Sequence, residues 1–393
     1  MERENRRLNR KRTKGDIWMI EKGPDAIKGN RIYFLDNLRT FMIFLVVLYH
    51  AGLVYEYTGI VAFFWIVHDL STNNLLIIPN FMIIDIFIMP TIFFISGFLT
   101  PLSSKKKKGW AFLKSKFKRL IIPWIFAVLT LMPLYKIIFL YSRKMPQESW
   151  TTYFHFNNGI FSQSWLWFLP VLFLFDILYL FFSRVNIKLP KITLTGAVGA
   201  VFLIGFIYSF CMDIFKGQGW TKTILIDFQN ERLLIYFMIF LLGSLCYKLK
   251  IFESKWKNKK LYILIICTAW IPIIVYRYFF INSFMRPGNH IFSEMVDALV
   301  TWFSFHLSLL CLLYVMINTF RYYLNKQGKI SQELNKNSYN VYIIHVIVLG
   351  GIALAMFNTA IPSLLKYLIL TVSTYAACNL IIYFYRKLIK SKI

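Results

Sequence analysis

Apolar residues along this chain gather into ten long runs that are separated by polar and basic loops. Each run is close to the ~20 residues that an α-helix needs to cross a bilayer. The pattern therefore predicts an all-α polytopic membrane protein with about ten transmembrane helices. The predicted spans are about 38–57, 79–99, 120–141, 165–184, 192–212, 231–249, 261–281, 295–318, 338–357 and 363–386.

The composition supports a membrane protein and argues against nucleic acid as a partner. Of the 393 residues, 58% are hydrophobic and 19% aromatic, which is far outside a soluble globular profile. The net charge of +27 comes mostly from basic residues between the apolar runs, so it indicates topology and contact with membrane lipid. The five cysteines show neither CxxC nor metal-type spacing, and we therefore expect packing residues and no metal site.

Basic residues fall on alternate loops, and this predicts the orientation of the chain. Lys and Arg gather before the first span, after spans two, four, six and eight, and after the last span. Because positively charged loops stay inside, both termini are predicted to be cytoplasmic, in a multi-pass protein of the plasma membrane. Residues 1–30 are interpreted as a basic cytoplasmic tail and 31–393 as one membrane domain. The first outer loop, 58–78, also suits a membrane-surface or re-entrant piece.

Three ionisable residues line one face of the first span. Arg39 and His50 are eleven residues apart, which leaves their side chains within ~20° of each other around an α-helix and ~16 Å apart along it. Asp36 lies one turn before Arg39 on the same stripe. Ionisable groups at membrane depth are costly, and their default interpretation is a functional site that faces a cavity or a partner helix.

The inner end of the second span leads into a dense basic segment. Ser96 and Gly97 provide a small spot for close approach, and Pro101 is expected to end the helix. A short amphipathic segment then leads to Lys116 and Arg119, one turn apart at the mouth of the predicted bundle. This pair suits either a pyrophosphate or 3′-phosphate group, or ordinary contact with anionic lipid.

Other polar and aromatic groups in the spans are weighed individually. Asp85 is expensive unless it is paired, and a functional role or a pairing with His50 is favoured. Tyr339 and His345 suit the lining of an inner cavity. Trp167 suits either an interfacial anchor or a stacking surface for a sugar ring, and His306 is interpreted as a packed, hydrogen-bonded residue.

Taken in order, these segments resemble a known family. The runs LDNLRTFMIFLVVLYHA, FFISGFLTP, RLIIPW, SWLWFLPVLFLFDILY, FLLGSLCYK and NSYNVYIIHVIV are similar to the membrane-embedded acyltransferase-3 family, closest to its branch related to glucan-modifying succinyltransferases. The similarity covers about 31–357, and Arg39 and His50, spaced as Arg-x10-His, are its most specific part. The ten spans with both ends inside also agree with that family.

The resemblance implies an enzyme that moves an acetyl or succinyl group from cytoplasmic acyl-CoA to a hydroxyl of a cell-envelope glycan or glycoside. The arginine and histidine of the family fall on Arg39 and His50. Its basic RxxR signature falls on Lys116 and Arg119, where lysine replaces the first arginine and weakens a bidentate grip on phosphate.

A family acid at the outer end of a late helix corresponds to Glu294, or to Asp297 one turn away. The expected catalytic set is then His50, Arg39, Asp36 and Glu294. His50 would act as general base on the acceptor hydroxyl, or would carry the acyl unit if transfer takes two steps.

Arg39 would hold the CoA end or the thioester carbonyl, and Glu294 or Asp85 would orient the imidazole of His50 from another helix.

Two other classes of protein remain open. A flippase or exporter of a lipid-linked polysaccharide could use the same polar stripe, although the related halves common in secondary transporters are not evident. A non-catalytic partner or sensor would not need an acid, an arginine and a histidine on one face.

Overall fold

The computed structural model describes residues 32–56, 65–69, 77–107, 109–154, 163–184, 192–253 and 258–390. In these ranges, ten helical segments are long and apolar enough to cross a membrane. The predicted all-α membrane fold is confirmed. The tail 1–30 and most of the first outer loop lie outside the described residues, so the domain division and the cytoplasmic placement of both termini stay predictions.

The helices follow the predicted spans closely, and α8 and α9 together make up one span, Lys259–Ser283. The helices are α2 (Tyr33–Gly52), α3 (Ile77–Lys106), α4 (Trp110–Ser142), α5 (Phe168–Arg184), α6 (Leu194–Ile214), α7 (Leu233–Lys248), α8 (Lys259–Thr268), α9 (Trp270–Met285), α10 (Glu294–Tyr323), α11 (Lys329–Ala355) and α12 (Ser363–Lys390). Between them lie the 3-10 turns η2 (Leu53–Tyr55), η4 (Trp150–Phe154), η5 (Ser164–Trp167) and η6 (Asn230–Arg232), and the strands β1 (Trp220–Lys222) and β2 (Asp227–Gln229).

Pro101 does not end the second helix, contrary to the expectation. α3 continues through Pro101 to Lys106, and the basic segment that follows forms the first turns of α4 instead of a separate short helix. Proline lacks a backbone N–H and so removes one hydrogen bond from the helix. In the same turn the hydroxyl oxygen of Thr100 lies 2.9 Å from the carbonyl oxygen of Ser96, next to the Gly97 carbonyl that Pro101 leaves without its usual backbone partner.

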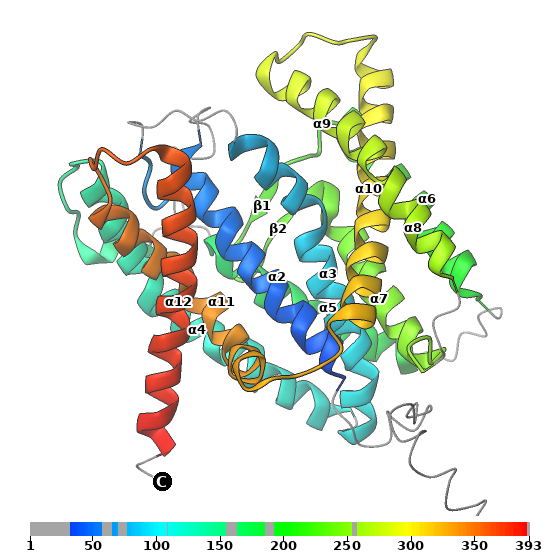
Figure 1. The fold of residues 1–393 in the computed structure, drawn as a ribbon, viewed down its shortest axis with the longest axis horizontal. Coiled ribbons are helices and arrows are strands. Elements are labelled where there is room, and N and C mark those ends of the chain that lie inside the picture. The colour runs from blue at the N-terminus through cyan, green and yellow to red at the C-terminus, as the bar shows by residue number, and fades with distance from the viewer. Residues whose placement is uncertain are drawn as a thin grey trace, which may run out of the picture.

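α2 lies at the centre of the bundle. It packs against α3, α10, α11 and α12, and Figure 1 shows α4, α11 and α12 to one side of it and α6, α8, α9 and α10 to the other. Its residues Leu38, Met42 and Val47 are completely buried. By contrast, α6 and α8 expose large apolar side chains such as Leu203 and Leu264, as helices that face lipid do.

Close packing of α3 on α7 depends on one glycine from each helix. A Cβ at Gly97 would collide with the backbone of Phe240, and one at Gly243 would collide with the backbone of Phe94. Small residues let helix backbones approach closely in membranes, where packing drives association. The small spot predicted around Gly97 is therefore a contact between two helices.

A small antiparallel hairpin joins α6 to α7 and meets the turn before α5. In this hairpin Trp220 pairs with Gln229. The buried carboxylate of Asp227 accepts hydrogen bonds from the backbone N–H of Gln163 at 2.7 Å and of Thr223 at 3.0 Å. The hairpin is thereby held against η5, which carries Trp165 and Trp167.

Candidate active site

The last turn of α2 places His50 against His345, which lies well inside α11. Nδ1 of His50 lies 2.7 Å from Nε2 of His345. Nδ1 of His345 in turn lies 2.7 Å from the backbone carbonyl oxygen of Tyr342. His345 is fully buried and His50 is half-buried, so the imidazole of His345 supports that of His50 from inside the bundle.

This hydrogen-bond chain defines the proton positions on both rings. A carbonyl oxygen only accepts, so Nδ1 of His345 donates to Tyr342, and Nε2 of a neutral His345 is then an acceptor. His50 must donate to it through Nδ1. A neutral His50 therefore keeps Nε2 without a proton, ready to act as a base.

Trp65 covers His50 from the loop after α2. The indole and imidazole rings stack with their centres 4.9 Å apart and their planes at 17°. Sequence reasoning did not single out Trp65, because it is one aromatic residue in an apolar loop. Its place at the site depends on the segment 65–69 lying over the end of α2.

Trp165 holds α11 where it carries His345. The indole N–H of Trp165 donates to the backbone carbonyl of Ile343 at 2.9 Å, and the hydroxyl of Tyr342 donates to the backbone carbonyl of Trp165. The Trp165 ring also lies edge-on to His345, with ring centres 6.4 Å apart. These contacts tie the support of the imidazole pair to the turn before α5.

Arg39 lies on the same side of α2 as His50, because both residues meet α11. The Arg39 guanidinium lies 3.1 Å from the carboxylate of Asp36 and 3.5 Å from the backbone carbonyl of Asn335. About a quarter of the Arg39 side chain is accessible. The structure thus places Asp36, Arg39 and His50 along one helix–helix contact, with the ion pair at the N-terminal end of α2.

Lys116 is engaged by a buried acid. Its Nζ lies 3.0 Å from Oδ1 of Asp176, and the hydroxyl of Thr100 donates to the same oxygen at 2.9 Å. The Asp176 side chain is completely buried, and a buried carboxylate requires a partner of opposite charge. The ion pair with Lys116 meets this requirement and connects α4 to α5. A contact of Lys116 with phosphate stays a prediction.

Arg119 is the exposed member of the predicted phosphate pair. Among the described residues, its guanidinium forms no hydrogen bond, so it is available to an anion. Its backbone carbonyl accepts a hydrogen bond from the hydroxyl of Tyr339 at 2.7 Å, which joins α4 to α11. Ser96 is half-buried on α3.

Asp85 pairs with Arg232, and not with His50. Nη1 of Arg232 lies 2.6 Å from Oδ2 of Asp85, and the guanidinium lies 4.8 Å from the ring centre of Phe305. The Arg232 side chain is only 5% exposed, whereas that of Asp85 is 36% exposed. In the sequence Arg232 looks like an interfacial charge just before a span. The structure buries it between Asp85 of α3 and Phe305 of α10.

An aromatic group extends from this ion pair towards the hairpin. Trp167 stacks on Tyr236 with ring centres 6.0 Å apart, and it meets Trp220 edge-on at 5.5 Å. Tyr236 follows Arg232 by one helical turn, and Trp220 is about half exposed. Trp167 is thus a member of an aromatic cluster that reaches solvent through Trp220.

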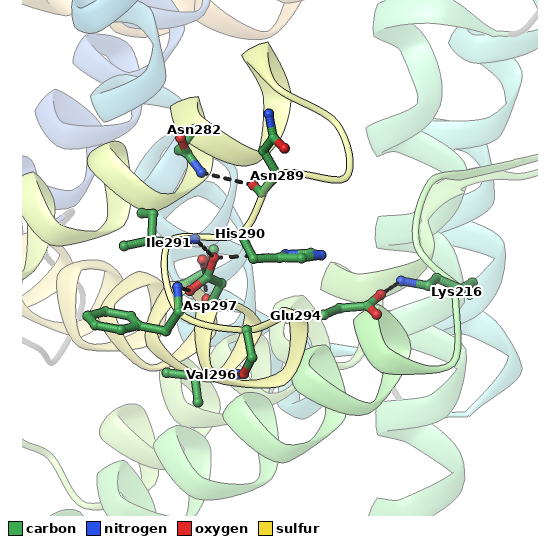
Figure 2. A network of polar contacts seen from close by, with 11 residues as sticks. Lys216, Asn282, Asn289, His290, Ile291, Glu294, Val296 and Asp297 are labelled. Atoms are coloured by element: carbon green, nitrogen blue, oxygen red, sulfur yellow. Dashed lines mark hydrogen bonds and ion pairs between the residues drawn. The ribbon is translucent and has the colours of Figure 1, made fainter.

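The acids at the start of α10 have partners of their own. Figure 2 shows Glu294 in an ion pair with Lys216, which follows α6. Asp297 accepts the backbone N–H of Ile291 at 2.7 Å and that of Phe292 at 3.1 Å. Asp297 therefore shapes the turn that leads into the helix.

The expectation that an acid orients the imidazole is wrong in its choice of residue. The group that hydrogen-bonds His50 is His345, whereas Asp85 binds Arg232 and Glu294 binds Lys216. The catalytic role that the resemblance implies for Glu294 stays a prediction.

His306 is a packed, hydrogen-bonded residue, as interpreted from the sequence. Its Nδ1 lies 2.8 Å from the backbone carbonyl of Trp302 and its Nε2 lies 3.4 Å from the hydroxyl of Ser209. In the part of the chain that the structure describes, no three His, Cys, Asp or Glu side chains are grouped to hold a metal ion.

Comparison with known proteins identifies the family. A family profile described as an acyltransferase domain, that of the acyltransferase-3 family, matches residues 32–383. No curated protein and no solved structure matches the chain significantly. Because the matched region takes in all the membrane-crossing helices except the end of the last, the chain belongs to the acyltransferase-3 family and is a membrane acyltransferase.

Proposed function

We propose that this protein is an O-acyltransferase of the plasma membrane that moves an acetyl- or succinyl-type group from cytoplasmic acyl-CoA to a hydroxyl of a cell-envelope glycan or glycoside. The observation that carries the proposal is the hydrogen-bond chain from Tyr342 through His345 to His50, which leaves one basic nitrogen on His50. Acyl transfer to an alcohol needs a base that takes a proton and returns it near neutral pH, and histidine suits that task.

The reaction is a direct transfer. Nε2 of His50 takes the proton of the acceptor hydroxyl while the hydroxyl oxygen forms a bond to the thioester carbon, whose carbonyl electrons move onto oxygen. The carbonyl then re-forms, the C–S bond breaks, and the imidazolium returns its proton to the CoA thiolate. His345 keeps the charged imidazole oriented through its hydrogen bond to Nδ1.

Two cations serve the donor. Arg119 is exposed at the cytoplasmic end of α4 under the predicted topology, and it suits the 3′-phosphate or pyrophosphate of CoA. Arg39 lies ~16 Å before His50 along α2, between that end and the base. Lys116 is already bound to Asp176, and only a remaining N–H of its ammonium is left for the phosphate.

Two features support a sugar acceptor. The carboxylate of Asp85 is held by Arg232 yet remains one-third exposed, so it can accept hydrogen bonds from hydroxyls. Trp167 and Trp220 belong to an aromatic cluster that reaches the ion pair through Tyr236, and this aromatic surface suits the apolar face of a sugar ring. A sugar acceptor agrees with the resemblance of the sequence to the glucan-modifying branch of the family.

Mass spectrometry of cell-envelope glycans tests the proposal. Cells that make the protein should carry glycans heavier by one acetyl or succinyl group than those of cells that lack it. The variant His50→Ala should abolish the difference, whereas His290→Ala, which alters a half-exposed histidine before α10, should keep it. The variants should first be shown to be inserted and folded.

Binding of radiolabelled acyl-CoA to the purified protein separates an enzyme from a transporter. A flippase would change the amount of surface glycan without engaging acyl-CoA and without adding mass to the glycan. Wild-type protein that neither binds acyl-CoA nor adds an acyl group would refute the proposal.

A further inference from the structure

Trp65 is held over His50 by a segment that is anchored from several sides. The backbone carbonyl of Trp65 accepts a hydrogen bond from the Arg143 guanidinium at 2.8 Å. Ile66 fills the space that Gly350 leaves on α11, where a Cβ would collide with it. The segment 65–69 is thus packed against α4 and α11 at the end of α2.

A buried ion pair fixes the other end of this segment. Nζ of Lys366 on α12 lies 2.8 Å from the carboxylate of Asp69, and these side chains are 0% and 4% exposed. The backbone N–H of Asp69 also donates to the carbonyl of Val54 at 3.0 Å. Charges are costly to bury and demand good geometry, so this pair determines where the segment lies.

The indole N–H of Trp65 lacks an acceptor among the described residues. Its Nε1 is buried and forms no hydrogen bond, although the Trp65 side chain lies against the base. Buried tryptophan N–H groups usually find a partner, because an unmade hydrogen bond is costly. A buried donor beside His50 that no described residue satisfies suits an acceptor that arrives with the substrate.

A second tryptophan shows that an indole N–H without an acceptor does not by itself define a site. Trp124 on α4 also has a buried Nε1 without a hydrogen bond among the residues described, but its ring does not stack on either histidine. An orphaned indole N–H is therefore not a site in itself. What distinguishes Trp65 is the parallel contact of its ring with the His50 imidazole at 4.9 Å.

We propose that Trp65 is a catalytic residue whose indole N–H donates to the carbonyl oxygen of the acyl thioester. This inference rests on the proposed function. As the acceptor oxygen bonds to the thioester carbon and His50 takes its proton, the carbonyl electron pair moves onto oxygen, and the indole N–H stabilises that negative charge. When the C=O bond re-forms, the C–S bond breaks and the proton passes from His50 to the thiolate.

The stabilisation is selective for the transition state. A fixed donor in a site that excludes water stabilises charge that develops on the oxygen more than it stabilises the neutral carbonyl. Removal of one such donor lowers kcat by about 10²- to 10³-fold in enzymes that use them. The stacked indole also covers one face of the imidazole.

The test compares two tryptophans changed in the same way. Wild type, Trp65→Phe and Trp124→Phe are reconstituted in lipid nanodiscs, with envelope glycan from cells lacking the protein as acceptor and acetyl-CoA or succinyl-CoA as donor. We expect Trp65→Phe to lower kcat by about 10²-fold with little change in the KM for acyl-CoA, because the donor acts mainly in the transition state. Trp124→Phe should match wild type.

A second replacement separates the N–H from the shape of the ring. Benzothienylalanine at position 65 keeps the bicyclic shape but has sulfur where indole has N–H, and it should show the same loss as Trp65→Phe. Wild-type kcat in either Trp65 variant would overturn the inference while the proposed function stands. Wild-type protein that transfers no acyl group would overturn both.

Discussion

Nε2 of His345 accepts a hydrogen bond from His50 across 2.7 Å, although the two histidines are 295 positions apart in the chain. The pair resembles the base and its orienting group in other enzymes of acyl transfer, with an imidazole in place of the usual carboxylate. It keeps the basic nitrogen of His50 turned away from α11.

Loss of His345 should remove the orientation of the base and leave donor binding intact. We expect His345→Ala to lower kcat by roughly 10²-fold, within the range of general acid–base contributions. His345→Gln keeps an amide oxygen that can accept from Nδ1 of His50, and it should recover part of the rate. Initial rates at saturating acyl-CoA provide the measurement. Equal, wild-type rates in both variants would contradict the orienting role of His345.

The two cations of the basic segment should behave differently when truncated. Lys116→Ala leaves the buried Asp176 without its ion pair, which should destabilise the protein by about 3–5 kcal/mol. Arg119→Ala should leave the thermal unfolding temperature unchanged and weaken acyl-CoA binding by about 10-fold or more, the effect of one hydrogen bond to a charged group.

Thermal unfolding in detergent and equilibrium binding of labelled acyl-CoA report these two effects separately. Lys118→Ala, which changes an exposed neighbour, provides the matched control. If Lys116→Ala weakened acyl-CoA binding without loss of stability, Lys116 would be a phosphate ligand, as the sequence suggested.

The pair of Asp85 and Arg232 should contribute to both folding and acceptor binding. Asp85→Leu leaves the buried guanidinium of Arg232 without this carboxylate, but Asp85 is one-third exposed, so the cost should be about 1–3 kcal/mol, below that of a fully buried pair. The double variant Asp85→Leu with Arg232→Met should regain most of that stability, since a well-packed apolar pair can replace a buried ion pair.

Recovery of stability should not restore acceptor binding. The KM for the glycan should stay raised in the double variant, while the KM for acyl-CoA stays that of wild type. A double variant with normal kinetics for the glycan would show that the pair is purely structural.

The ion pair of Lys366 and Asp69 should link folding to the position of Trp65. Lys366→Met leaves a buried carboxylate without this cation and should cost about 3–5 kcal/mol. Lys366→Met with Asp69→Leu should recover stability but lower kcat, because the segment that carries Trp65 loses the ion pair that determines its position. Hydrogen exchange of residues 65–69 should be faster in both variants. Normal exchange there would exclude an anchoring role.

The positions of the membrane spans, and the residues that share one face of a helix, follow from the sequence alone. The ten spans and the common face of Asp36, Arg39 and His50 were predicted correctly, because apolar run length and helical period are properties of one segment. An acid within an apolar span is costly unless it is paired, and on this ground the sequence predicted a partner for Asp85.

The identity of each partner came only from the packing of helices. His345 meets His50, Arg232 meets Asp85 and Asp176 meets Lys116 across distances of 60 to 295 residues in the chain. Several residues in the spans could satisfy each of these groups, and a local pattern contains no information on which helices touch. Close approach of the backbones selects the partners, and the position of the segment 65–69 over the end of α2 selects Trp65.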